Sequence, residues 1–288
     1  QDSLGYANSG RPYGVLIDFT ALPQAPRSED ESSTFRLALP ALNVFYSHPH
    51  TIVLKVTTFP EGYPNNPKFE YKLPAGANTV NYMERGWCFA ESAMSGLVKA
   101  SNRVLDLSKL KRPESVSLWA EILASKSGRA PPLHPGDFKQ ELDTKTFTSK
   151  KGDFEKVAKL YADAFERHLQ GAEELDFSGL KWDVGNLHKL LKALESNKTL
   201  TSLDLGGNTL GTEGAVALGQ FLKAHRTIQL LDLCHVSLNA QGTVALAQAL
   251  EDNATLVSLN LKFNSMGPEG FAALGKALNT MALQSLNL

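Results

Sequence analysis

The second half of the chain repeats one hydrophobic pattern at a nearly constant period. Leucines stand at Leu175, Leu203, Leu231, Leu259 and Leu286, with spacings of 28, 28, 28 and 27 residues. Apolar and polar residues alternate around each of them, as in LDFSGL, LDLGGN and LNLKFN, which predicts a short, half-buried strand. Between these strands, leucines such as Leu190 and Leu194 recur four residues apart and predict an amphipathic helix.

Each unit therefore has the order strand, loop, helix, loop. A single unit is too small to bury its own leucines, so we expect neighbouring units to stack into a solenoid, with strands on the concave side and helices on the convex side. The 28-residue period with helical returns resembles the ribonuclease-inhibitor type of leucine-rich repeat, over residues 173–288. This resemblance implies a curved surface that binds another protein.

The outward positions of the predicted strands form the expected partner surface. They are Glu174, Asp176, Ser202, Asp204, Leu230, Asp232, Ser258 and Asn260. The alternative is that acidic and amide residues commonly occupy this position in the repeat and have no role in binding. The chain begins with Gln1 and breaks off at Leu288 inside a repeat strand, so we expect the natural protein to extend further.

The first 108 residues carry a different pattern, in which three short apolar runs alternate with helical segments. The runs are residues 14–19, 51–56 and 103–107, and helices are expected from Ser33 onward and over residues 85–99. This alternation predicts an α/β fold with a parallel sheet in three layers, flavodoxin-like in arrangement. Ligands of such sheets gather at the carboxyl ends of the strands, which here carry Asp18, Thr57 and Asp106.

One segment of this domain carries a distinctive motif, W-C-x-x-E, formed by Trp87, Cys88 and Glu91. It resembles the third-helix motif of TIR domains, and Leu16-Ile17-Asp18 is similar to the strand that precedes it in that family. The resemblance implies that Glu91 would be the catalytic carboxylate of an NAD hydrolase, with NAD as substrate, and that Trp87 and Cys88 would pack under the sheet. The ligand-binding candidates of the domain are Asp18 and Asp106 at the strand ends, together with Trp87. The alternative is structural: Trp87 anchors the helix on the sheet, and Glu91 pairs with Arg85 or Lys55.

Between the two halves the composition shifts to Lys, Ser, Pro and Gly. Residues 109–152 are expected to form a linker with one short helix from Gly136 to Leu142, because its prolines exclude longer regular elements. Residues 153–172 place apolar side chains on one side of a helix, which should cap the first repeat.

Composition narrows the functional classes. The chain has 29 Lys and Arg against 30 Asp and Glu, a net charge of −1 that favours neither nucleic acid nor a membrane surface as partner. Two cysteines in different regions suit a reducing compartment, so the cytoplasm is expected. No glycine-rich phosphate loop follows a predicted strand, and no spacing of ligand residues indicates a metal site.

The sequence thus predicts a protein-interaction or scaffold protein without a cofactor, whose TIR-like α/β domain is a non-catalytic adaptor that could also self-associate. Two alternatives stay open at this point. One is an NAD glycohydrolase that uses Glu91, and the other is a structural subunit of a large assembly.

Overall fold

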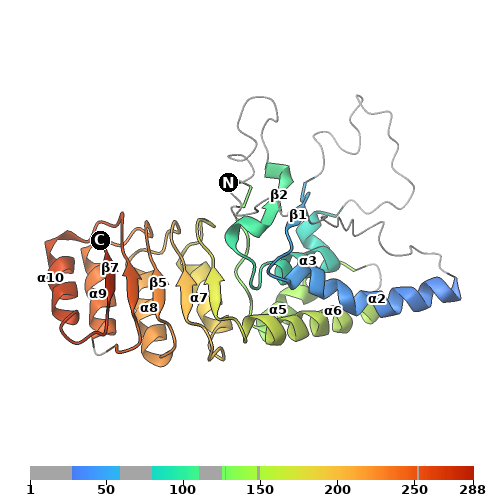
Figure 1. Cartoon of the computed structure of the whole chain (residues 1–288). Coiled ribbons are helices and arrows are strands. Elements are labelled where there is room, and N and C mark those ends of the chain that lie inside the picture. The colour runs from blue at the N-terminus through green and yellow to red at the C-terminus, as the bar shows by residue number, and fades with distance from the viewer. Residues whose placement is uncertain (1–27, 59–79, 110–124, 127, 148–149, 252) are drawn as a thin grey trace, which may run out of the picture. The chain divides into compact units, whose positions relative to one another are not determined.

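The computed structural model describes residues 28–58, 80–109, 125–126, 128–147, 150–251 and 253–288 (Figure 1). Contacts divide the chain into two units, Gln1–Leu42 and Asn43–Leu288, and the boundary falls within helix α2 (Glu29–Ser47). Within the described ranges, no helix combines the length and the apolarity that a membrane crossing requires.

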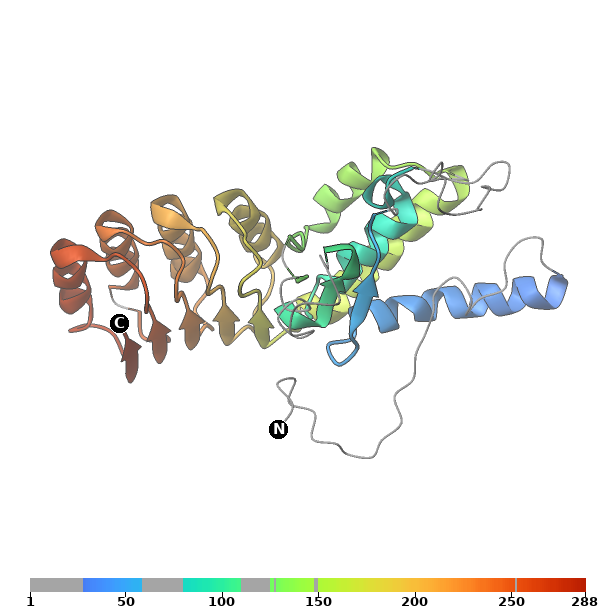
Figure 2. The same cartoon turned by 90° about the horizontal axis from the view of Figure 1, so that it is seen from above.

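The leucine-rich segment forms a five-stranded parallel sheet in the order β3-β4-β5-β6-β7. The strands are β3 (Glu174–Asp176), β4 (Ser202–Asp204), β5 (Leu230–Asp232), β6 (Ser258–Asn260) and β7 (Ser285–Asn287). The helices that follow the first four strands are α7 (Val184–Ala193), α8 (Gly211–Ala224), α9 (Ala240–Leu250) and α10 (Gly267–Ala277). Figure 2 shows the strands as one row and these helices as a second row beside it. The strands predicted from the leucine period are confirmed.

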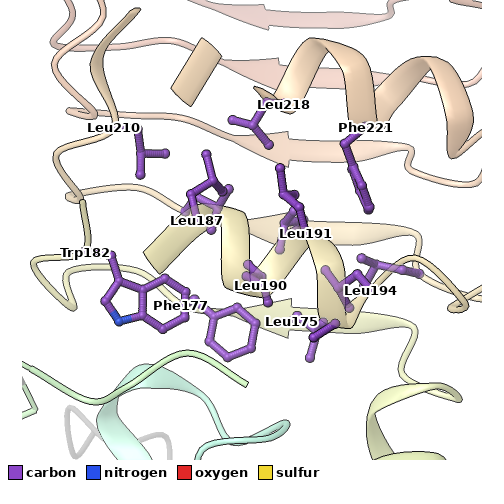
Figure 3. Packing of buried hydrophobic residues seen from close by; sticks show 14 of the residues in the cluster. Leu175, Phe177, Trp182, Leu187, Leu190, Leu191, Leu194, Leu210, Leu218 and Phe221 are labelled. Carbon is purple, nitrogen blue, oxygen red and sulfur yellow. The ribbon is translucent and has the colours of Figure 1, made fainter. Parts of the chain in front are cut away.

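The in-register leucines hold the two rows together. Leu175 pairs with Leu203, and the match continues through Leu231, Leu259 and Leu286. The first four of these side chains are almost completely buried. Figure 3 shows Leu190 of α7, and Leu194 directly after this helix, close to Leu175 of the first repeat. The helix leucines at the matching phases of the later repeats are buried in the same core. Each unit thus buries its apolar stripe against its neighbours.

Buried asparagines satisfy the backbone of the loops that lead from strand to helix. Asn208 Oδ1 accepts from the N–H groups of Leu180 and Trp182, at 3.2 and 3.0 Å, and Asn208 Nδ2 donates to the carbonyls of Phe177 and Leu205, at 2.9 and 2.7 Å. Asn208 therefore serves the loop of the preceding repeat as well as its own. Buried peptide groups need such partners, because an unmet one is costly.

Asn264 makes the corresponding bonds two repeats later. Its Oδ1 accepts from Val236 and Leu238, at 3.2 and 3.0 Å, and its Nδ2 donates to the carbonyls of Leu233 and Leu261, both at 2.8 Å. At the same position the first and third repeats carry the buried apolar residues Leu180 and Val236. The bridging amide therefore occurs in every second repeat.

The helix starts follow the same alternation. In the first and third repeats, the side chains of Asp183 and Asn239 cap α7 and α9 by accepting from the N–H groups of Asn186 and Gly242. In the second and fourth repeats, α8 and α10 lack a side-chain cap and begin at Gly211 and Gly267, with φ of 62° and 61°. A positive φ suits glycine because it has no Cβ. The repeats thus alternate between two types.

Three helices upstream of the repeats share one aromatic core. They are α3 (Gly86–Ser95), α5 (Pro135–Asp143) and α6 (Lys150–Ala164), which the π-helical turn η4 (Phe165–Leu169) continues. The ring of Phe138 stacks on Phe89 and on Tyr161, at centroid distances of 5.2 and 3.7 Å. Helix α5 matches the short helix predicted from Gly136 to Leu142. It packs on α6 and α3, so the described part of the predicted linker belongs to the core.

The described part of the predicted α/β domain contains one pair of parallel strands, β1 (Val53–Lys55) and β2 (Val104–Asp106). Three short 3-10 turns flank this part of the chain: η1 (Tyr82–Glu84), η2 (Ser101–Arg103) and η3 (Leu107–Lys109). The predicted strand at residues 14–19 and the ligand candidate Asp18 lie outside the described residues. A TIR-like, three-layer domain is therefore not shown.

Helix α2 begins earlier than predicted, at Glu29 rather than at Ser33. The backbone N–H of Ser28 donates to Glu31 Oε2 at 2.8 Å, and the N–H of Glu31 donates to Ser28 Oγ at 3.2 Å. This reciprocal pair is a capping box, which stabilises a helix start. The acidic residues of the first turn favour the same start through the helix dipole.

We predict that Asn208→Ala lowers the free energy of unfolding by about 3 kcal/mol, because four backbone hydrogen bonds of the buried loops lose their partner. Urea denaturation of the full chain measures this change. The control is Asn279→Ala at an exposed position after α10. Equal stability of the two variants would contradict the bridging role of Asn208.

Candidate functional site

The parallel register brings the predicted partner residues together on the sheet. Glu174, Ser202, Leu230, Ser258 and Ser285 form one row across the five strands, and Asp176, Asp204, Asp232, Asn260 and Asn287 form a second. We call these ten residues the strand face. All of them are exposed or half-buried, whereas the leucine between them in each of the first four strands is buried. The strand face is thus a continuous solvent-facing surface.

The second row also has a structural task. Asp176, Asp204 and Asp232 each accept, through Oδ1, the N–H two residues further along, at 2.9, 2.8 and 2.8 Å. Asn260 does the same for Lys262 at 3.2 Å. These bonds fix the turn at the end of each strand. They favour the interpretation that acidic and amide residues belong to the repeat itself, and they leave the second carboxylate oxygen of Asp176 and Asp204 outside this turn.

Asp176, Asp204 and Asp232 are the acidic residues of the second row, which we call the acidic row, and the pKa of Asp204 at its centre is shifted. Burial raises the pKa of Asp204 from its ordinary 3.8 to about 6, and repulsion from Asp232 and Asp176 adds to the rise. The bond from Gly206 and the charge of Lys126 act in the opposite direction. The carboxylate of Asp232 has a further donor, because Asn260 Nδ2 donates to its Oδ2 at 2.7 Å. The acidic row therefore favours a positively charged partner group.

The turns after the strands hold a feature that the sequence analysis missed. The third residue after each of the first four strands has a positive φ: Gly179, Gly207, His235 and Phe263, at 62°, 70°, 53° and 57°. Lys181 and Ser237, two residues further along in the first and third repeats, also have a positive φ, of 59° and 62°. The turn is imposed by the repeat, because the N–H groups of Gly179, Gly207 and His235 donate to the carbonyl of the next repeat at 2.7 to 2.8 Å. The third and fourth repeats place bulky residues where glycine fits best. Both side chains are exposed, and Phe263 is 76% exposed.

These turns provide no metal site. Cys234 is half-buried next to the exposed His235, and burial together with Asp232 and Asp204 raises the pKa of its thiol. Across the described ranges, no three His, Cys, Asp or Glu side chains are grouped so that they could hold a metal ion.

The carboxyl ends of β1 and β2 meet, as a parallel pair requires. Thr57 Oγ1 donates to Asp106 Oδ2 at 2.7 Å, and the N–H of Ser108 donates to Asp106 Oδ1 at 3.1 Å. Asp106 is buried and lines a pocket of about 350 Å³ together with Lys55 and Arg129. A ligand-binding role for Asp106 stays a prediction.

The residues of the W-C-x-x-E motif lie elsewhere on α3. Trp87 Nε1 donates to Asp153 Oδ2 of α6 at 3.2 Å, so its indole is bonded to a helix. Glu91 is half-buried, and its carbonyl accepts from Ser95 Oγ. Neither Trp87 nor Glu91 is among the described residues that line the pocket beside Asp106. A catalytic role for Glu91 stays a prediction.

The raised pKa of Asp204 gives a pH-dependent prediction. The folded state holds this proton more tightly than the unfolded state, so the contribution of Asp204 to stability falls as the pH rises from 4 to 6. Asp204→Asn removes the charge and keeps an acceptor for Gly206, as Asn260 does for Lys262. We expect the variant to exceed the wild type by on the order of 1 kcal/mol at pH 7, after allowance for solvent screening. Urea unfolding at pH 4 should give no such gain, and an equal offset at both pH values would contradict the assignment.

Comparisons with known proteins bear on the repeats only. Residues 196–219 and 252–275 match a family model described as leucine-rich repeat, and these are the segments that carry Asn208 and Asn264. No curated protein matches the chain. One similar solved structure is that of leiomodin-1 actin-binding site 2, at 22% sequence identity and a TM-score of 0.39, over 43% of this chain and 75% of that one. Two segments of the chain are thus recognised as leucine-rich repeats.

Proposed function

We propose that this chain is a protein-interaction module that binds another protein through the strand face and the adjoining turns. In this proposal the repeats form a curved solenoid, and the strand face is its concave side. Parallel strands in register give a rigid, evenly spaced set of side chains, which is the kind of surface that repeat proteins present to partners. The module acts as a scaffold and needs no cofactor.

The observation that carries this proposal is the conformation of Phe263. A bulky residue at positive φ is strained by roughly 1–2 kcal/mol. Its ring is 76% exposed, so burial within the fold does not offset the strain. Aromatic side chains are frequent anchors of protein interfaces, where a partner buries them. His235 has the same conformation one repeat earlier, and Leu230 of the strand face is 47% exposed.

The proposed compartment is the cytoplasm. Cys88 and Cys234 are both free thiols, which suits a reducing environment.

Replacing the strained ring by glycine separates folding from binding. We expect Phe263→Gly to leave the free energy of unfolding unchanged or to raise it by up to about 1 kcal/mol, because glycine adopts this conformation without strain. Phe263→Ala should be less stable than Phe263→Gly. Urea denaturation measures both variants, and a loss of more than about 1 kcal/mol in Phe263→Gly would mean that the ring supports the fold.

Partner binding is tested with a matched pair of surface substitutions. We expect Leu230→Lys on β5 to abolish capture of a protein that the wild-type chain retains, because a lysine disrupts an apolar contact at the centre of the strand face. Phe271→Lys on α10 is the control, because Phe271 is 48% exposed on a helix outside the strand face.

The measurement is quantitative mass spectrometry of proteins retained by the immobilised full chain and by each variant. A protein that is lost with Leu230→Lys and kept with Phe271→Lys supports the strand face. Retention by both variants, or loss only with Phe271→Lys, would move the interface away from the strand face.

A further inference from the structure

The pocket beside Asp106 has a strong excess of positive charge. It lies where the carboxyl ends of β1 and β2 meet the segment 125–133 and helix α7. Five of its described lining residues are cationic, and two are acidic. The cations are Lys55, Lys109, Lys126, Arg129 and Lys189, and the acids are Asp106 and Glu141. Asp106 already accepts from Thr57 and Ser108 and lies 4.0 Å from Lys109 Nζ. Within the described chain, the carboxylates therefore do not balance the cations.

Arg129 is the most deeply buried of these five cations. Its side chain is 5% exposed. Its Nη1 donates to the carbonyls of Lys99 and Ala100, at 2.8 and 3.3 Å, which fixes one end of the guanidinium. Among the described residues, its Nε and Nη2 have no hydrogen-bond partner. These two nitrogens form one edge of the guanidinium, and their parallel N–H bonds match the two oxygens of a carboxylate or a phosphate.

A buried guanidinium with an unpartnered edge is costly unless an acceptor reaches it. Burial lowers the pKa of Arg129 to about 10, and Asp176 opposes this effect only in part. The Phe177 ring, 5.2 Å from Cζ, contacts a face of the group and provides no acceptor for its edge. A bound oxyanion would provide both the missing charge and the missing acceptors.

Lys55 is a second cation of the same pocket. Its Nζ donates to Ser92 Oγ at 2.8 Å. Burial lowers the pKa of Lys55 to about 8, Asp106 opposes this, and the charges of Lys109 and Arg129 lower it further. Mutual repulsion among Lys55, Lys109 and Arg129 would fall if an anion lay between them.

The pocket also has an apolar part. It is lined by Phe89, Val104 and Leu133, and the uncharged polar residues of the lining are Thr57, Ser92, Ser125 and Asn186. A volume of about 350 Å³ is comparable to that of small-molecule sites, which combine apolar walls with a few polar groups that fix orientation. The carboxyl ends of parallel strands are also where such ligands bind in open α/β sheets.

We propose that this pocket binds a small organic anion. Its phosphate or carboxylate group lies against the Nε and Nη2 edge of Arg129 and against Lys55, and its apolar part lies against Phe89, Val104 and Leu133. The site uses other residues than the strand face, so it is a second function of the chain and does not depend on partner binding.

The test is calorimetric titration of the full chain with phenyl phosphate, benzoate, inorganic phosphate and the uncharged probe phenol. We expect phenyl phosphate or benzoate to bind at least about tenfold more tightly than phenol, because charge-assisted bonds to Arg129 and Lys55 require an anion. The tighter of the two identifies the headgroup as phosphate or carboxylate. Inorganic phosphate should bind more weakly than phenyl phosphate, because it cannot use the apolar wall.

Two variants locate the site. Arg129→Met removes the guanidinium, and with it the bonds to the carbonyls of Lys99 and Ala100 that could be needed for folding. Lys55→Met leaves these bonds intact, so this second variant tests the site in a folded chain. Each should weaken anion binding by about tenfold or more, the effect of losing one charge-assisted contact. Lys223→Met, at an exposed position on α8, is the control and should bind like the wild type. Equal binding of phenol and the anions, or unchanged affinity in Lys55→Met, would overturn the proposal.

Discussion

The irregular segments between strand and helix run through the interior of the repeats, and their peptide groups must find hydrogen-bond partners there. Asn208 and Asn264 meet this demand, because each amide reaches the backbone of two adjacent repeats. At the other end of the unit, Asn197 plays a similar part by donating to the carbonyl of Leu169 and accepting from Leu200. The register of the strands, and with it the strand face, depends on these bonds.

The same constraint extends beyond the repeats to the segment that carries the cationic pocket. Trp182 Nε1 donates to the carbonyl of Arg129 at 2.6 Å, and the N–H of Gly128 donates to the carbonyl of Leu180 at 3.1 Å. The first repeat therefore holds the backbone of the segment that presents Arg129. Asp176 of the strand face in turn interacts electrostatically with that guanidinium. The two proposed sites are separate in their residues, yet the first repeat supports both.

The sequence predicted the strands and helices of the repeats closely, because a leucine period is a direct consequence of stacking identical units. It could not reveal His235 and Phe263 as strained, although alignment with Gly179 and Gly207 would have provided a signal. It gave no indication of the buried hydrogen bonds of Asn197, and it placed Arg129 in a linker. Long-range contacts determine these roles, and local composition does not encode them. Asp18 and the strand expected around it lie outside the described residues.

The alternation of bridging amides and apolar residues has a consequence for how such an array changes its length. The loops of the first and third repeats are hydrogen-bonded to the asparagine of the following repeat, Asn208 or Asn264. The helix starts alternate in the same way. Loss of the second repeat alone would place the first directly beside the third and leave the loop of the first without its bridging amide. Loss of the second and third repeats together would place Asn264 beside the loop of the first, so a change in length by a pair of repeats preserves this bonding.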